Sequence, residues 1–534
     1  MGSVLDTAHE TAVLLPKSQG SDDAVFAAKM RLVNRSIDQI GFTAYHMKLF
    51  CLSGFGYAAD SLMGFLISVA ADQVVAEYRP AWTRGGQVAL YAGLLLGSFC
   101  WGLGADVLGR RGAFHLSLFV CAFFGILAGL APSYGSWAIC VALSGFGEGG
   151  NIALDATVFL EFLPSNKRWL VTTLACWWGV GQAAAGLLAW PLLGTEGLSC
   201  SLDEDGPECL RSNNMGWRYL YVTAGSIILL MATARGLLIR LHETPQYLVG
   251  RGQDADVVDF LTDLATAYRR PCDLTLEALQ ACGTVQGADT HRDTHTQAHA
   301  HARRTVQTSQ IHWLHELRSH FAGLFSASHR MTASVLLLWL AWALIGLAYP
   351  LFYLFLPEYL ASRGPETQPT SVWVGFLLTN VCAIPGPVIA GWLCEMPAAG
   401  RKGTMSLGAL ATMASFVGYT AAASTASPRQ GLFWSCAISM CINVYYATLY
   451  AYTPEVLPPC HRATGYGVAL AANRLMGIVA ALVVSVVSTA TATPLYLCAG
   501  LFFLAAVVSV GFPIETRDAG ILTQGCHEDG VSTL

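Results

Sequence analysis

The sequence predicts an all-α membrane protein with twelve transmembrane helices in two pseudo-symmetric six-helix bundles and with both chain termini in the cytoplasm. The composition, the number of apolar stretches and a motif that occurs once in each half support this prediction. Of the 534 residues, 54% are apolar and 12% are charged, whereas a soluble chain carries about 25% charged residues. So few charges cannot cover the surface of a long chain, which is therefore expected in a lipid bilayer. The net charge of −5 gives no indication of nucleic-acid binding.

Twelve stretches are apolar enough to cross a membrane as helices, which takes about 20 residues for a hydrocarbon core of about 30 Å. In the first half they cover 49–70, 86–105, 113–131, 137–160, 170–193 and 218–240. In the second half they cover 333–356, 372–394, 404–424, 431–451, 464–488 and 494–513. They lack the alternating pattern of a transmembrane barrel, so helices are the expected way to pair the backbone in lipid.

Basic residues in the short loops predict the orientation, because Lys and Arg collect on the cytoplasmic side of a membrane. With twelve spans, one face receives Arg110, Arg111, Lys167, Arg168, Arg401, Lys402 and Arg462. This orientation divides the chain into a cytoplasmic tail (1–48), a bundle (49–240), a partly disordered cytoplasmic linker (241–332), a second bundle (333–513) and a second cytoplasmic tail (514–534).

Two segments of the linker have a distinct pattern. Residues 253–270 have the spacing of an amphipathic helix that lies on the bundle. Residues 288–304 are polar and contain regularly spaced histidines, a pattern that also occurs in metal sites. A disordered tract of low complexity is the interpretation we favour, and we expect neither a metal nor any other cofactor.

The loop at 193–217 is the largest one on the opposite face, and it contains Cys200 and Cys209 among acidic residues. If this face meets an oxidising compartment, the two cysteines are expected to form a disulfide, and otherwise they remain free thiols.

The motif E-x-L-P-x-x-x-R runs from Glu161 to Arg168 and again from Glu455 to Arg462. A second motif, G-x-x-x-D-x-x-G-R-R, contains Asp106, Arg110 and Arg111, and a longer, degraded copy contains Glu395 and Arg401. All four segments fall on the predicted cytoplasmic face. The usual excess of basic residues on the cytoplasmic face would explain the arginines and lysines alone. The acids at matching spacing favour ion pairs that form in one state of the protein and separate in another.

These motifs resemble those of the major facilitator superfamily. The segments from Glu243 to Leu248 and from Pro513 to Arg517 are similar to the boundary motifs of its sugar porters. The segments that contain Glu148 and Asp155, and the segment from Asn214 to Tyr219, look like those of its synaptic-vesicle-glycoprotein-related branch, in a fungal form. The resemblance covers roughly residues 40–517, apart from the linker.

The resemblance implies a secondary active transporter that moves a small organic solute by alternating access, as a symporter or an antiporter coupled to protons, and not an enzyme. A monomer in the plasma membrane is expected, with a vacuolar or other endomembrane location left open. The resemblance further implies a cytoplasmic gate made of Asp106, Arg110, Arg111, Glu161, Arg168, Glu395, Arg401, Glu455 and Arg462. The seventh span lacks the glutamines of hexose porters, which favours an organic anion or a secondary metabolite over a hexose. A solute sensor that does not transport is the alternative.

Among the ionisable residues of the predicted spans, four are the candidates for function, namely Asp60, Glu148, Asp155 and Arg474. Such a residue costs about 2.5–3.5 kcal/mol on insertion, so it indicates function. One charge-balanced arrangement places one of the acids opposite Arg474 across a central cavity, where an acid carries the proton and Arg474 holds an anionic solute or serves as the counter-charge. The structural alternative is a set of permanent ion pairs that fix helix packing.

Other polar or aromatic residues of the spans are predicted to contact the solute, because such cavities combine apolar walls with a few polar groups. They are Gln182, Trp342, Tyr349, Tyr353, Asn380, Asn443 and Tyr446. For each aromatic residue, packing or lipid contact is the competing explanation.

Overall fold

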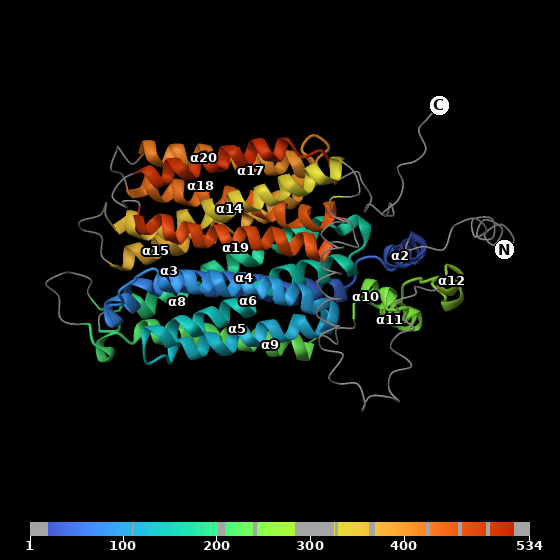
Figure 1. The fold of residues 1–534 in the computed structure, drawn as a ribbon, viewed down its shortest axis with the longest axis horizontal. Coiled ribbons are helices and arrows are strands. Elements are labelled where there is room, and N and C mark those ends of the chain that lie inside the picture. Colours follow the sequence, from blue (N-terminus) through green and yellow to red (C-terminus); the bar gives the residue numbers. More distant parts are fainter. Residues whose placement is uncertain are drawn as a thin grey trace, which may run out of the picture.

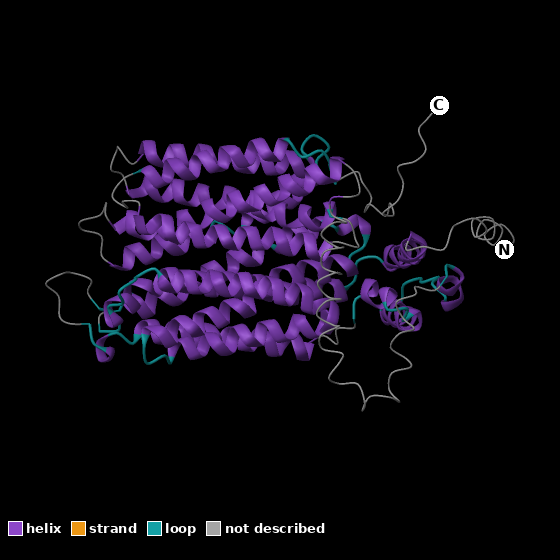
Figure 2. Ribbon diagram, viewed as in Figure 1, coloured by secondary structure: helices purple, strands orange, loops and turns teal. Residues whose placement is uncertain are grey.

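The computed structural model describes residues 20–108, 110–195, 197–200, 209–238, 243–283, 325, 329–361, 369–422, 428–457, 462–486 and 492–516. Within these ranges the chain is helical and contains no β-strand (Figure 2). The histidine tract at 288–304 lies outside the described residues.

Two layers of long, roughly parallel helices make up the body of the protein (Figure 1). The first half contributes α3 (Ala44–Tyr78), α4 (Gly85–Leu108), α5 (Arg110–Gly129), α6 (Tyr134–Phe162), α7 (Trp169–Leu174), α8 (Cys176–Leu193) and α9 (Gly216–Leu238). The second half contributes α14 (His329–Ala361), α15 (Pro369–Val381), α16 (Pro385–Glu395), α17 (Gly400–Ala422), α18 (Pro428–Val456), α19 (Arg462–Val486) and α20 (Thr493–Val510). Short 3₁₀ turns occur at Ser165–Lys167 (η1) and Arg211–Asn213 (η2).

Nine helices of the described ranges are long and apolar enough to cross a membrane. The helices α4, α6 and α17 are not among these nine, but they pack against members of the same bundles. Two of the predicted stretches are interrupted. The stretch 170–193 breaks at Ala175 between α7 and α8, and the stretch 372–394 breaks before Pro385, which begins α16. Proline has no backbone N–H to donate, so it fits best in the first turn of a helix, where Pro385 lies.

The two halves meet mainly along three helix pairs, α4 with α19, α8 with α15 and α7 with α16. The broken helices also cross near their breaks, where a Cβ atom on Gly179 would lie 2.9 Å from the backbone nitrogen of Ile384. Inside the first half, a Cβ atom on Gly145 would lie 2.7 Å from the carbonyl oxygen of Leu90. Small residues at such points let helices approach closely in a membrane.

Four further helices form a separate group beyond one end of the bundles (Figure 1), and we call it the end group. It consists of α2 (Gly20–Ile40), α10 (Pro245–Gly250), α11 (Asp254–Ala267) and α12 (Leu276–Ala281). The amphipathic helix that the sequence predicts at 253–270 is α11, whose Val257 and Leu261 are buried. Residues 20–40, which the sequence assigns to the N-terminal tail, form the helix α2.

A buried ion pair joins α2 to α11. The ammonium group of Lys29 lies 2.6 Å from the Oδ2 atom of Asp254, and its side chain is only 1% exposed. Because removing one member of such a pair leaves the other charge buried and unpaired, the contact holds the N-terminal helix to the linker.

We predict that Lys29→Met weakens the packing of α2 on α11 by about 3 kcal/mol, which corresponds to roughly a hundredfold faster hydrogen exchange of the α2 amides. Hydrogen–deuterium exchange with mass spectrometry measures this change. Arg31→Met is the matched control, because Arg31 is an exposed base on the same helix. Unchanged exchange in Lys29→Met would contradict the prediction.

Candidate functional site

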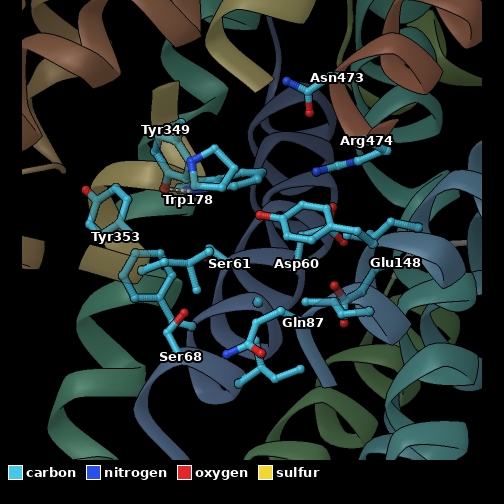
Figure 3. A pocket seen from close by; sticks show the side chains of 18 of the residues that line it. Asp60, Ser61, Ser68, Gln87, Glu148, Trp178, Tyr349, Tyr353, Asn473 and Arg474 are labelled. Carbon is cyan, nitrogen blue, oxygen red and sulfur yellow. Dashed lines mark hydrogen bonds between the residues drawn. The ribbon is translucent and has the colours of Figure 1, made fainter. Parts of the chain in front are cut away.

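A small cavity lies between the two halves, and Figure 3 shows its lining. The helices α3, α4, α6 and α8 contribute on one side, and α14, α18 and α19 on the other. Its polar lining consists of Asp60, Ser61, Ser68, Gln87, Glu148, Asn473 and Arg474, and its aromatic lining of Phe65, Tyr91, Trp178, Tyr349, Tyr353 and Tyr446. The cavity volume is ≈ 60 Å³, which is room for only a few water molecules.

Two carboxylates of the first half and one guanidinium of the second half share this cavity. Asp60 on α3, Glu148 on α6 and Arg474 on α19 are each no more than 6% exposed. The Nδ2 atom of Asn151 donates to Oδ1 of Asp60 at 3.4 Å, and the hydroxyl of Ser144 donates to Oε1 of Glu148 at 3.5 Å. The other carboxylate oxygen of Asp60 has no hydrogen-bond partner in the described part of the chain.

Arg474 forms no ion pair within 4.0 Å and no side-chain hydrogen bond with any residue that the structure describes. It does interact electrostatically with Asp60. A buried charge is costly unless it is paired. The donors of Arg474 therefore remain available to a group that enters the cavity.

Aromatic rings from both halves form the remaining wall. Trp178 of α8 and Tyr446 of α18 lie nearly parallel, at an interplanar angle of 24° and with their ring centroids 6.0 Å apart. The Nε1 atom of Trp178 donates to the hydroxyl of Tyr349 at 3.0 Å, and the amide of Gln182 also donates to it. The Nδ2 atom of Asn473 donates to the Tyr446 hydroxyl at 3.2 Å. These bonds fix the rings and link the two halves at the cavity.

The structure brings together part of the predicted solute site. Of the residues predicted for the central cavity, six line it: Asp60, Glu148, Arg474, Tyr349, Tyr353 and Tyr446. Gln182 and Trp342 lie behind the wall, bonded to the Tyr349 hydroxyl and to Thr453 respectively. Asn380, Asn443 and Asp155 are buried but do not line the cavity.

Gln87, Tyr91, Trp178 and Asn473 line the cavity without having been predicted. A glutamine in an apolar stretch and an asparagine beside Arg474 were signals that sequence reasoning had available. Nothing in the sequence distinguishes Trp178 from its neighbour Trp177, which packs instead at Gly54 and Phe55.

Asp155 has a partner other than Arg474. Its Oδ2 atom lies 2.9 Å from Arg235 of α9, and both side chains are fully buried. The guanidinium of Arg235 also donates to the carbonyl oxygens of Leu52 and Phe114, at 2.8 and 2.9 Å. This pair joins α3, α5, α6 and α9, which agrees with the structural alternative for Asp155. The sequence places Arg235 in the sixth span, where its buried charge went unnoticed.

The repeated motifs form charge clusters in each half. Arg110 pairs with Glu161 in the first half. In the second half Arg401 pairs with Glu395 at 3.1 Å and with Glu455 at 3.2 Å. The backbone N–H of Arg111 donates to Glu243 at 3.3 Å. The side chains of Asp106 and Arg462 lie outside the described residues.

Two contacts of these clusters were not predicted. Glu515 accepts backbone hydrogen bonds from Arg401 at 2.9 Å and from Lys402 at 3.1 Å, so the segment after α20 holds the second cluster. Arg168 interacts electrostatically with Glu455, so the arginine of one copy of the motif faces the glutamate of the other across the two halves.

The end group contacts the first copy of the motif directly. The carboxylate of Asp38 on α2 accepts from the backbone N–H of Ser165 at 2.6 Å and from its hydroxyl at 2.8 Å. The rings of Tyr45, Phe162 and Phe260 pack together beside it, with centroids 5.5–6.1 Å apart. Movement of the loop at Ser165 is therefore tied to α2 and α11.

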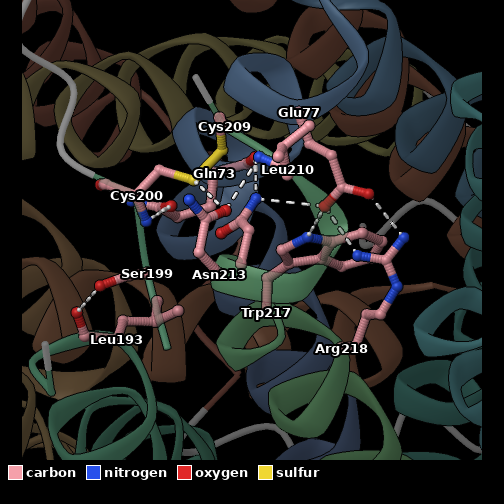
Figure 4. Close-up of a disulfide and its surroundings, with 11 residues drawn as sticks. Gln73, Glu77, Leu193, Ser199, Cys200, Cys209, Leu210, Asn213, Trp217 and Arg218 are labelled. Atoms are coloured by element: carbon pink, nitrogen blue, oxygen red, sulfur yellow. Dashed lines mark hydrogen bonds and ion pairs between the residues drawn. A yellow bond between two sulfur atoms is a disulfide. The ribbon is translucent and has the colours of Figure 1, made fainter. Parts of the chain in front are cut away.

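At the opposite end of the bundles, Cys200 and Cys209 form a disulfide (Figure 4). The side chain of Gln73 bonds the backbone N–H and carbonyl of Cys200, at 2.9 and 3.2 Å. Nearby, Arg218 forms a bidentate pair with Glu77 at 2.7 and 2.8 Å. The segment from Asn214 to Tyr219 thus holds the start of α9 against the end of α3.

Two helical halves around a charged, aromatic cavity, with charge clusters at one end, define a membrane transporter. A profile of the Major Facilitator Superfamily matches residues 49–481, and the chain belongs to this superfamily of transporters, which are not enzymes.

Relatives and solved structures agree with this assignment. The chain is similar to the MFS siderochrome iron transporter 1 of Ceriporiopsis subvermispora, at 36% identity over 93% of this chain and 92% of the relative. It is similar to an uncharacterised MFS-type transporter of Schizosaccharomyces pombe (35% identity; 92% and 89% covered) and to the synaptic vesicle 2-related protein of Xenopus laevis (25%; 93% and 84%). The solved proton:xylose symporter XylE has the same fold, with a TM-score of 0.64 at 15% identity, over 89% of this chain and 97% of that chain.

We predict that Arg235→Met destabilises the protein by about 3 kcal/mol or more, because Asp155 then stays buried without its counter-charge. The double variant Asp155→Leu with Arg235→Met is expected to recover most of this loss, since neither charge remains. Thermal unfolding of the purified protein in detergent measures both. Arg79→Met, at an exposed base, serves as the control. A single variant as stable as the wild type would contradict the structural role of the pair.

Proposed function

We propose that this transporter carries a small organic anion, or a secondary metabolite that bears an acidic group, together with protons. The observation that carries the proposal is the buried guanidinium of Arg474, which has no ion-pair partner in the described part of the chain and which lines the same cavity as Asp60 and Glu148. The sequence-based preference against a hexose points the same way.

The chemistry of Arg474 favours an anion. A guanidinium presents planar donors that match a carboxylate or a phosphate in a bidentate geometry. The neighbouring rings of Trp178 and Tyr446 offer flat apolar surface, and the hydroxyls of Tyr349 and Tyr353 offer polar contacts. A hexose has no charge to pair with the guanidinium, so the group whose unpaired burial costs the most free energy would stay unpaired.

Asp60 and Glu148 supply the coupling in this proposal. When both are ionised, their negative charge offsets the positive charge of Arg474 and opposes the entry of an anionic solute. Protonation of one carboxylate removes that repulsion, so an anion binds Arg474 more readily when a proton is bound. Proton and solute would then cross together, as in a symporter, and the reverse order of events would give efflux.

The small size of the cavity supports transport by alternating access. At ≈ 60 Å³ it is far smaller than a typical ligand pocket of about 300–1,000 Å³. The halves must separate for a solute to enter, and the cavity lies between them as in other carriers built from two related bundles. In this proposal one mouth opens and closes at the clusters around Glu161 and Arg401, and the electrostatic interaction of Arg168 with Glu455 across the halves supports that role.

The proposal includes twelve spans, with α7–α8 and α15–α16 each counting as one broken helix. The proposal also puts the ends of the chain, the linker and the end group in the cytoplasm, and the basic residues of the short loops support this orientation. The disulfide at the opposite end fits an oxidising compartment outside the cell, which favours the plasma membrane. A monomer suffices, because both walls of the cavity come from one chain.

The names of the relatives do not assign the solute. One is a siderochrome iron transporter and the structural neighbour is a xylose symporter. Untargeted comparison of metabolites in cells and medium, between strains that lack and overproduce the protein, identifies candidates for assay. Flux in liposomes that contain only this protein then tests transport, and binding without flux would show a sensor instead.

We predict that Asp60→Asn abolishes the dependence of flux on a pH gradient, because the amide cannot exchange a proton. Vesicles that are acidic outside are compared with vesicles at equal pH, with the solute found above. Asp256→Asn is the control, because Asp256 is an exposed acid of α11. Wild-type stimulation by the gradient in Asp60→Asn would remove Asp60 from the coupling.

We predict further that Arg474→Gln weakens binding of the anionic solute by roughly 10- to 100-fold, which is the usual contribution of a hydrogen bond to a charged group. Arg474→Lys keeps the charge but not the planar donors, so its affinity is expected to lie between those of the wild type and of Arg474→Gln. Calorimetry with purified protein measures the affinities. Equal affinity in the wild type and in Arg474→Gln would refute an anion site at Arg474.

A further inference from the structure

We propose that the junction of α2, α3 and α11 binds the headgroup of an anionic phospholipid. This site is separate from the central cavity. A groove of ≈ 370 Å³ lies at the junction, lined by Phe42, Thr43, Ala44, Met47, Tyr268 and Arg270. All of its lining comes from the turn before α3, the first turn of α3 and the end of α11.

Two turns of the backbone build the groove. Gly41, with φ of +69°, separates α2 from α3, and Thr43 forms the N-cap of α3. On the other side Arg269, with φ of +53°, ends α11, and the N–H of Arg270 donates back to the carbonyl of Ala265 at 2.8 Å. The left-handed turn at Arg269 thus brings a pair of adjacent arginines to the start of a membrane-crossing helix.

Three bases gather at this junction without an ion-pair partner in the described part of the chain. Arg269, Arg270 and Lys48 are exposed, and their side chains form no ion pair or hydrogen bond with the described residues. The two acids that flank the junction along the chain are already engaged, Asp38 with Ser165 and Asp273 with Gln39 at 2.8 Å. The N-terminus of α3 adds a partial positive charge.

The apolar side of the groove selects a lipid over a soluble phosphate. Met47 is 50% exposed on the first turns of α3, and Phe42 and Tyr268 are partly exposed beside it. The helix α3 is apolar enough to cross the membrane from Ala44 onward, so Met47 lies where the chain enters the bilayer. Arginines at the headgroup level and a methionine below them match a phosphate and its acyl chain.

The test uses the full-length protein purified in detergent, with phosphatidylserine, phosphatidylcholine or inorganic phosphate added. Native mass spectrometry counts bound lipid, and thermal unfolding reports affinity. We expect retention of phosphatidylserine but not of phosphatidylcholine. The double variant Arg269→Gln with Arg270→Gln should weaken phosphatidylserine binding on the order of tenfold or more, since each base near an anionic headgroup contributes about 1 kcal/mol.

Two controls make the outcome decisive. Arg31→Gln with Arg35→Gln removes two exposed bases of the same end group that do not line the groove, and it should bind like the wild type. Met47→Gln should weaken binding of the lipid. The proposal fails if the arginine variant retains phosphatidylserine as the wild type does. It also fails if inorganic phosphate stabilises the protein as much as the lipid and Met47→Gln has no effect, because the site would then hold a free anion.

Discussion

The buried guanidinium of Arg474 is the constraint on which the rest of the cavity depends. It belongs to the second half, whereas the carboxylates that face it, Asp60 and Glu148, belong to the first. Charge in the cavity is therefore balanced only across the boundary along which the halves must move. A proton or an anion that enters changes this balance, and through it the attraction between the halves. Coupling in the proposed mechanism follows from this division of charge.

The other buried ion pairs have a different role, because each of them lies within one half or within the end group. Arg235 and Asp155 fix four helices of the first half, Arg218 and Glu77 fix its far end, and Lys29 and Asp254 fasten α2. The end group is held to the first half where Asp38 of α2 accepts hydrogen bonds from Ser165, in the loop of the first motif copy. The second copy is held by Glu515 from the segment after α20.

Sequence reasoning predicted the helical architecture, because long apolar stretches have few alternatives in lipid. It also selected Asp60, Glu148 and Arg474, because charge inside a membrane is rare. It missed Arg235, since a base near the end of a span is usually assigned to the interface. It could not predict that Trp178 lines the cavity and Trp177 does not, or that Asn380 and Asn443 lie away from it. The direction in which a side chain of an all-apolar helix points depends on how helices distant in the sequence pack against it. The helical state of residues 20–40 depends on contacts with α10 and α11, which lie more than 200 residues away along the chain.

The central claim, that protonation of Asp60 and Glu148 controls the separation of the halves, can be tested without knowing the solute. Pulsed electron paramagnetic resonance measures that separation between spin labels at Asn166 and Ala398. Both residues are exposed, and they lie near the motif loops of the two halves. The account predicts that the distance distribution shifts between neutral and acidic pH, and that Asp60→Asn with Glu148→Gln removes the shift. A wild-type distribution that does not respond to pH, or a response that survives in the double variant, would contradict it.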